Sequence, residues 1–114
     1  MNEFFDTNRD LTSIEAVLQQ LVPMLGDARE AFMNSEAEYD RAYSYKLLMT
    51  KAQNPKYTQA QLEAEAIVGT HDKKLDCIKK ESAYRRIDDK IRLLRDRIEV
   101  LKEKSYNLRT EAKI

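Results

Sequence analysis

A run of lysines and arginines in the last third of the sequence carries the clearest chemistry of the chain, namely contact with phosphates. It comprises Lys73, Lys74, Lys79, Lys80, Arg85, Arg86, Lys90, Arg92, Arg95 and Arg97. Basic side chains neutralise phosphates and gain free energy from counterion release. Tyr84 lies within the run, and aromatic rings stack on unpaired bases whatever their sequence. The run predicts nucleic-acid binding, although the solvated flanks of a coiled coil carry similar charges.

His71 and Cys77 are the only histidine and the only cysteine of the chain. A metal site needs several such ligands, and a cysteine nucleophile needs a base beside it. The two residues are six positions apart on an expected helix, so their side chains point in different directions. Cys77 is therefore expected to pack as a small hydrophobe, and a lone cysteine suits a reducing compartment.

Four carboxylates lie among the basic residues: Asp72, Asp76, Asp88 and Asp89. Paired carboxylates can act as general acid and base, but only in a pocket that perturbs them. Intrahelical ion pairs, Asp76 with Lys80 and Asp88 with Arg92, account for them more simply. No glycine-rich loop offers a phosphate cradle. We predict that the chain is not an enzyme and uses no cofactor or metal.

Two periodic series of apolar or small residues indicate the helices that position these groups. The first comprises Ile14, Leu18, Leu21, Leu25, Ala28, Phe32, Ser35, Tyr39, Ala42 and Met49, and the second Ile87, Ile91, Leu94, Ile98, Leu101, Ser105, Leu108 and Ala112. Because one such residue every 3.5 positions stays on one side of a helix, each series predicts a packing face, here called the apolar seam. Long helices have a thin core, so we expect a homo-oligomer. Its subunit contacts are predicted at Ile87, Ile91, Leu94, Ile98, Leu101 and Leu108.

The first half of the chain is predicted to form an arm and two helices. Residues 1–10 lack periodicity and are expected to be a flexible arm, whose two phenylalanines either dock on a partner or cap the bundle. Thr12 with Glu15 has the capping-box form, which predicts a short helix over 12–24. Pro23 predicts a kink or break before a second helix over 27–53.

The second half is predicted to form one long helix. Asn54 precedes a proline, which ends the second helix. Thr58 with Gln61 repeats the capping-box form, so a helix is expected over 58–113. Gly69-Thr70 is its weak point, and the helix either breaks there or runs on.

The expected fold is therefore all-α: a single domain, 1–114, forming a long antiparallel helical hairpin with a short N-terminal helix. Charged residues make up 35% of the chain, with only two glycines and two prolines, which is typical of solvated helices. Residues 1–71 carry 6 basic and 11 acidic side chains, and residues 72–114 carry 14 and 9. The halves could attract each other, or the basic half could meet a polyanion. Without a signal peptide or a bilayer-spanning run, we expect a protein of the bacterial or phage-infected cytoplasm.

The layout from Tyr39 to Leu108 resembles the phage T4-type UvsY recombination mediators. The resemblance rests on Leu47-Leu48-Met49-Thr50-Lys51-Ala52, a short polar turn, a capped helix and a long helix with Asp72-Lys73-Lys74-Leu75 near its start. Lys51 and Ala52 match two positions of the family's basic Lys-Ala-Arg-like element, whereas Gln53 departs from its arginine. The family's oligomerising part would map onto Leu101–Ile114.

The resemblance implies a ring-forming accessory protein that binds single-stranded DNA and assists a recombinase or annealing protein. Phosphate contacts are then expected from Lys51, Lys73, Lys74, Lys79, Lys80, Arg85 and Arg86. An adaptor or phage-encoded inhibitor that presents a helical face to another protein is the alternative. A membrane-surface helix is disfavoured, because no unbroken basic face lies opposite an apolar one.

Overall fold

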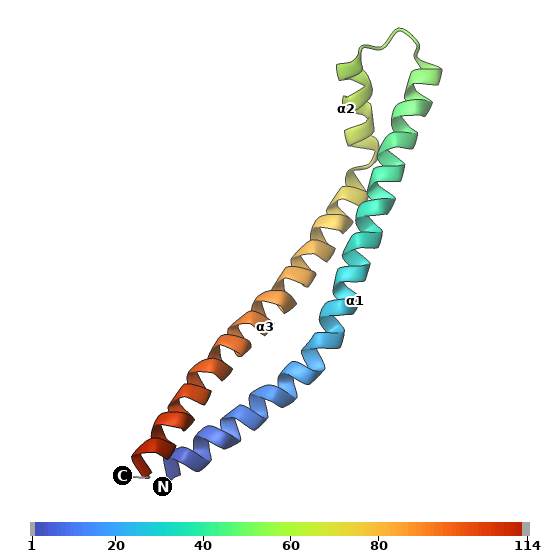
Figure 1. The fold of residues 1–114 in the computed structure, drawn as a ribbon. Coiled ribbons are helices and arrows are strands. Elements are labelled where there is room, and N and C mark those ends of the chain that lie inside the picture. Colours follow the sequence, from blue (N-terminus) through green and yellow to red (C-terminus); the bar gives the residue numbers. More distant parts are fainter. Residues whose placement is uncertain (1, 113–114) are drawn as a thin grey trace. The chain divides into compact units, whose positions relative to one another are not determined.

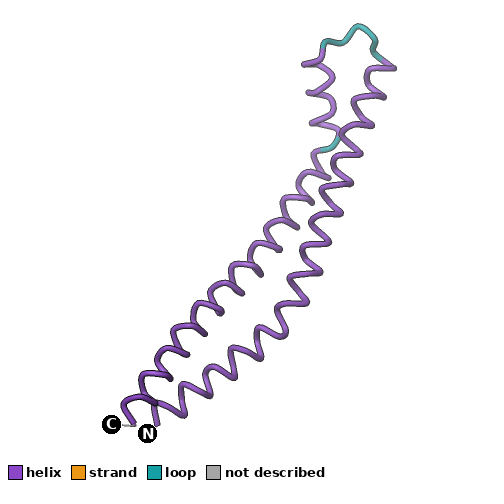
Figure 2. The backbone as a smooth tube through the Cα atoms, viewed as in Figure 1, coloured by secondary structure: helices purple, strands orange, loops and turns teal. Residues whose placement is uncertain are grey.

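The computed structural model describes residues 2–112, and they form three helices and no strand. These are α1 (Asn2–Gln53), α2 (Gln59–Gly69) and α3 (His71–Ala112), joined by one short loop and one single-residue break (Figures 1 and 2). α1 and α3 run antiparallel. The all-α hairpin is thereby confirmed.

The predicted arm and the predicted break before residue 27 are both wrong, because α1 is one helix from Asn2 to Gln53. Pro23 lies inside it, since proline deletes a single backbone hydrogen bond and a long packed helix tolerates that loss. Thr12 is not a cap. Its hydroxyl donates a hydrogen bond to the Asn8 carbonyl one turn back, at 3.0 Å.

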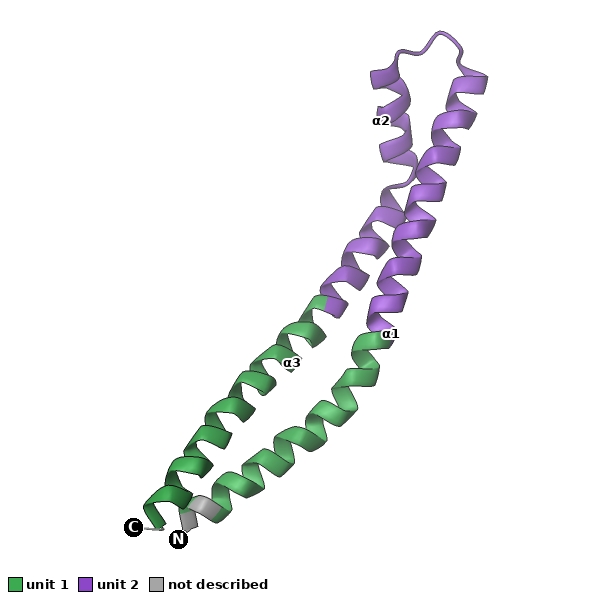
Figure 3. Ribbon diagram, in the orientation of Figure 1, with its two compact units in different colours: residues 1–26, 85–114 green, residues 27–84 purple. Residues whose placement is uncertain are grey.

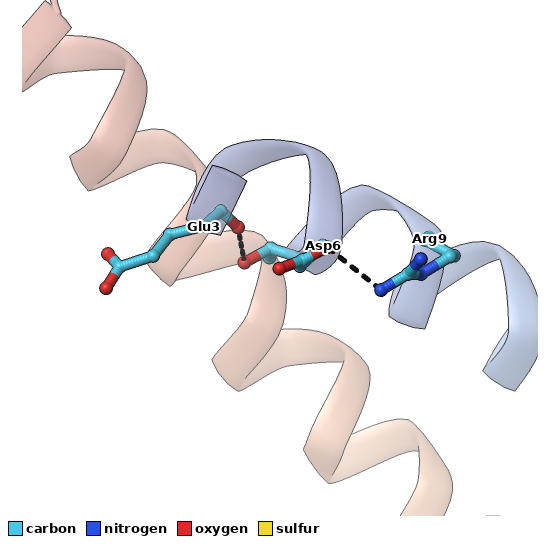
Figure 4. Close-up of polar contacts among 4 residues, drawn as sticks. Glu3, Asp6 and Arg9 are labelled. Atoms are coloured by element: carbon cyan, nitrogen blue, oxygen red, sulfur yellow. Dashed lines mark hydrogen bonds and ion pairs between the residues drawn. The ribbon is translucent and has the colours of Figure 1, made fainter. Parts of the chain in front are cut away.

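The first turns of α1 are held by local polar contacts. The Arg9 guanidinium pairs with the Asp6 carboxylate at 2.9 Å (Figure 4). The Thr7 hydroxyl donates to the Glu3 carbonyl at 2.7 Å, and Thr7 is buried. These contacts span three and four residues, and they support a helix in a segment whose own periodicity does not predict one.

The contacts of the chain group it into two compact units (Figure 3). Unit 1 contains residues 1–26 and 85–114, and unit 2 contains residues 27–84. In unit 1 the start of α1 packs beside the end of α3. Its core is formed by Ile14, Ile98 and Leu101, with Leu11, Leu18 and Leu94 packed against it.

The residues predicted to join subunits are instead covered within unit 1. Ile91, Ile98 and Leu101 are buried, and Ile87, Leu94 and Leu108 are partly buried. In an antiparallel hairpin the seam of one helix meets the seam of the other, so one chain satisfies both. The 3.5-residue spacing thus marks residues that are covered within the chain, and their role in contacts between copies stays a prediction.

Unit 2 contains the end of α1, the loop, α2 and the first turns of α3. The capping box at Thr58 is confirmed: its hydroxyl accepts from the Gln61 N–H at 3.2 Å, and the Gln61 side chain accepts from the Thr58 N–H at 2.8 Å. Leu62, Ala66 and Cys77 form the buried apolar side of α2 and α3. Cys77 therefore packs as expected.

The long final helix is interrupted at Thr70, which resolves the alternative left open by the sequence. Gly69 has a low helix propensity, and the Thr70 hydroxyl donates to the Ala66 carbonyl at 2.6 Å. Thr70 leaves the helical region, with φ −117° and ψ 13°. α3 begins at the next residue.

Candidate nucleic-acid interface

The seven predicted phosphate ligands are all exposed, but they do not share one face. Lys51, Lys73, Lys74, Lys79 and Lys80 belong to unit 2, whereas Arg85 and Arg86 belong to unit 1. A helix turns by about 100° per residue, so Lys73 and Lys80 lie on one side of α3. Lys79 lies on the side opposite buried Cys77. The structure therefore distributes the basic residues around α3.

Two of these lysines already have partners within the chain. The Lys74 ammonium lies 4.9 Å from the centre of the Tyr39 ring, and the Lys80 ammonium is 3.2 Å from the Asp76 carboxylate. Contacts of this kind at exposed positions contribute only about 0–1 kcal/mol. A phosphate can compete with them, so both lysines remain usable.

The predicted ion pairs of α3 are present. Besides Lys80 and Asp76, the Arg92 guanidinium lies 3.0 Å from the Asp88 carboxylate. These aspartates serve local pairing along the helix. No group of three or more metal-binding side chains occurs among the described residues.

The hairpin end of unit 2, residues 41–62, is a basic region that the sequence reasoning missed, here called the tip. Between Asp40 and Glu63 there is no acidic residue, while Arg41, Lys46, Lys51 and Lys56 are basic. These residues span the end of α1, the loop and the start of α2 (Figure 1). A count of acids around the predicted turn would have revealed it.

Two tyrosines accompany these lysines with their rings accessible. Tyr45 on α1 is 65% exposed and Tyr57 in the loop is 38% exposed. Lys51 and Lys56 are also exposed. The tip thus combines accessible ammonium groups with accessible aromatic rings, the two elements that hold single-stranded nucleic acid without reading its sequence.

The loop of the tip is a defined structure. The Asn54 N–H donates to the Thr50 carbonyl at 2.8 Å, and the Tyr57 N–H donates to the Asn54 carbonyl at 3.0 Å. Asn54, Pro55, Lys56 and Tyr57 line an open hollow of about 310 Å³. The hollow lies at the exposed loop of the tip, where Lys56 and Tyr57 are both among its lining residues.

Lys46 differs from the other tip lysines because its stem is used for packing. It is partly buried, and a Cβ placed on Gly69 would lie 2.8 Å from Lys46 Cε. The missing side chain of Gly69 makes room for this stem. Lys46 therefore joins α1 to the end of α2 and is not among the phosphate ligands that we assign.

Comparisons with family models, curated proteins and solved structures gave no match. None of the helices formed by residues 2–112 is both long enough and apolar enough to cross a membrane.

Proposed function

We propose that the chain binds single-stranded DNA without sequence preference through the tip of unit 2. The observation that carries this proposal is the acid-free stretch from Arg41 to Leu62, with exposed Lys51, Lys56, Tyr45 and Tyr57. Lysines there would neutralise phosphates while the rings stack on bases. The lysines of α3, Lys73, Lys74, Lys79 and Lys80, would extend the contact along unit 2.

Local charge supports this assignment better than the charge of the whole unit. Unit 2 carries 9 basic and 10 acidic residues, so its net charge attracts no polyanion. Surface charges are screened over about 8 Å at physiological ionic strength, and a phosphate at the tip responds mainly to the nearby lysines. Binding should therefore weaken steeply as salt rises.

The biological role proposed is that of a phage-type accessory protein of DNA recombination in the bacterial cytoplasm. In that role it would help a recombinase or annealing protein to occupy DNA that a single-strand-binding protein covers. Support comes from the resemblance to the UvsY-type mediators at Lys51 and Ala52, which lie in the last turn of α1, within the tip. A homo-oligomer would multiply a weak contact into a useful one.

A second candidate is an adaptor or inhibitor that binds another protein through a helical face. The observation favouring it is the set of large apolar side chains exposed on unit 2, among them Met33 and Leu48 on α1. Isolated exposed apolar residues are common on soluble proteins, which is why we rank this function second.

Fluorescence anisotropy of a labelled single-stranded oligonucleotide, titrated with the protein from low to physiological salt, tests the first proposal. Binding that prefers single strands to duplex and falls with salt supports it. Failure to bind at low salt would remove the DNA-binding function and leave the adaptor.

A further inference from the structure

α2 and the start of α3 carry a second line of residues that the fold of unit 2 leaves uncovered, here called the outer stripe. It consists of Ala60, Ala64, Ile67, His71, Leu75 and Ile78. All six are exposed, including Ile67 at 56%, Leu75 at 42% and Ile78 at 49%. The spacings of three and four residues are those of a helix-packing face.

The outer stripe continues across the break at Thr70. On α2 the stripe residues are rotated about 100–160° around the helix axis from buried Ala66. On α3 they are rotated by the same amount, in the same direction, from buried Cys77. The offset is the same in both helices. Because both buried sides pack within unit 2, the stripe is one face of that unit and not two unrelated patches.

We propose that the outer stripe binds the outer stripe of a second copy of this chain in antiparallel orientation. The matching register places Ala60 opposite Ile78, Ala64 opposite Leu75, and Ile67 opposite His71 of the other copy. A small residue faces a large one in the first two pairs, and Ile67 faces the imidazole of His71 in the third. A two-fold axis repeats each pair, so the surface is self-complementary, as an isologous interface requires.

The charges beside the stripe select the same arrangement. Glu63 and Lys74 lie on the same flank, each about 60° from the buried side. In an antiparallel pair each flank faces its own equivalent, so Glu63 of one copy meets Lys74 of the other, twice. The second flank brings Gln61 near Lys79, with no pair of like charges.

A parallel arrangement is less favourable. Parallel helices bring opposite flanks together with an offset of about five residues. Lys74 of one copy would then lie beside Lys79 of the other, which is a repulsion. The two alanines lie at the α2 end of the stripe, and Leu75 and Ile78 lie at the α3 end, so a reversed second copy is the partner that fits.

Charge exchange, measured by sedimentation equilibrium at low salt without DNA, tests the pairing. Glu63→Lys and Lys74→Glu should each raise the dimer dissociation constant at least about tenfold, since each creates two like-charge contacts. Lys74→Glu also removes the contact with Tyr39 within the chain, so Glu63→Lys is the cleaner single change. The double exchange should restore most of the affinity. If the double exchange does not restore the dimer affinity, the proposed register is wrong. If the wild-type chain stays monomeric at about 1 mM, the proposed dimer itself is wrong.

Cysteine cross-linking tests the orientation in a Cys77→Ala background. Ala64→Cys combined with Leu75→Cys should form a disulfide-linked dimer on mild oxidation, whereas either change alone should not. A cross-link from Leu75→Cys alone would indicate parallel pairing and contradict the proposal. Circular dichroism of each variant verifies that the helices persist. Because Lys51 and Lys56 lie outside the stripe, their replacement should leave dimerisation unchanged, which separates this proposal from DNA binding.

Discussion

The ammonium of Lys74 on α3 lies over the ring of Tyr39 on α1, 4.9 Å from its centre, and joins two helices of unit 2. Tyr39 belongs to the apolar seam and is partly buried, while Lys74 is exposed. The ring face attracts a cation, so the pair contributes to the contact between α3 and α1 at this level. Lys74, a residue of the basic run, therefore also makes a contact within the fold.

This pair gives the first prediction. A double-mutant cycle on Tyr39→Leu and Lys74→Met, followed by urea unfolding, should give a coupling free energy of about 0.5–1 kcal/mol. Tyr39→Phe should keep the coupling, because the ring face rather than the hydroxyl is used. A coupling indistinguishable from zero would show that the cation–ring contact does not stabilise the fold.

The tip gives the second prediction. Lys51→Ala combined with Lys56→Ala should weaken binding of single-stranded DNA and reduce the slope of log affinity against log salt by about 1–2, because each lysine displaces about one counterion. The matched control is Lys90→Ala with Lys104→Ala, two exposed lysines of α3 in unit 1. An equal loss in both variants, measured by anisotropy, would show that the tip is not the binding surface.

Stacking at the tip gives the third prediction. Tyr57→Ala should lower the affinity for single-stranded DNA by about 1–3 kcal/mol while leaving the salt slope unchanged, since the ring neutralises no phosphate. Tyr57→Phe should bind like the parent chain. The control is Tyr106→Ala in unit 1, which removes a ring that is 68% exposed and should have no effect.

The core of unit 1 gives the fourth prediction. Ile98→Ala should lower the free energy of unfolding by about 2–5 kcal/mol, whereas Val100→Ala, two residues away and 64% exposed, should change it by less than about 1 kcal/mol. Because Ile98 packs within one chain, the loss should not depend on protein concentration. If the loss of unfolding free energy disappears when the variant is concentrated, Ile98 instead lies at a contact between subunits.

The middle of α1 gives the fifth prediction. Gly26 lies within the helix, no glycine of the described residues has a positive φ, and a Cβ added there meets nothing within 4 Å. Gly26→Ala should therefore raise the free energy of unfolding by about 0.5–1 kcal/mol, as calorimetry or urea unfolding would show. Gly69→Ala should give no such gain, because its Cβ would press on Lys46.

The sequence predicted those features whose signals are local. Thr58 and Gln61 make the expected capping box, and Asn54 stands just past the end of α1. Thr12 carries the same signature and is not a cap, because the preceding residues are already helical and its hydroxyl turns back to Asn8. What distinguishes the two threonines is packing at the start of α1, which no local window contains.

The partner of the apolar seam was equally beyond the sequence. A spacing of 3.5 residues predicts that the Ile98 side chain is buried, but it does not say whether the same chain or another copy buries it. For the site, Lys51 was identified through a resemblance and is exposed as expected. The tip as a whole has only four basic residues spread over 22 positions, so its signal is the absence of acids from residue 41 to residue 62 and not a run of basic residues.

The contact between Asn8 and Ser105 joins residues 97 positions apart, at 3.5 Å, whereas unit 2 is one continuous stretch of chain. During synthesis, unit 2 has all its residues once Tyr84 has left the ribosome, but unit 1 must wait for the last turns of α3. Closing so long a loop also costs more entropy than closing the hairpin. This topology favours formation of unit 2 before the start of α1 packs against the end of α3.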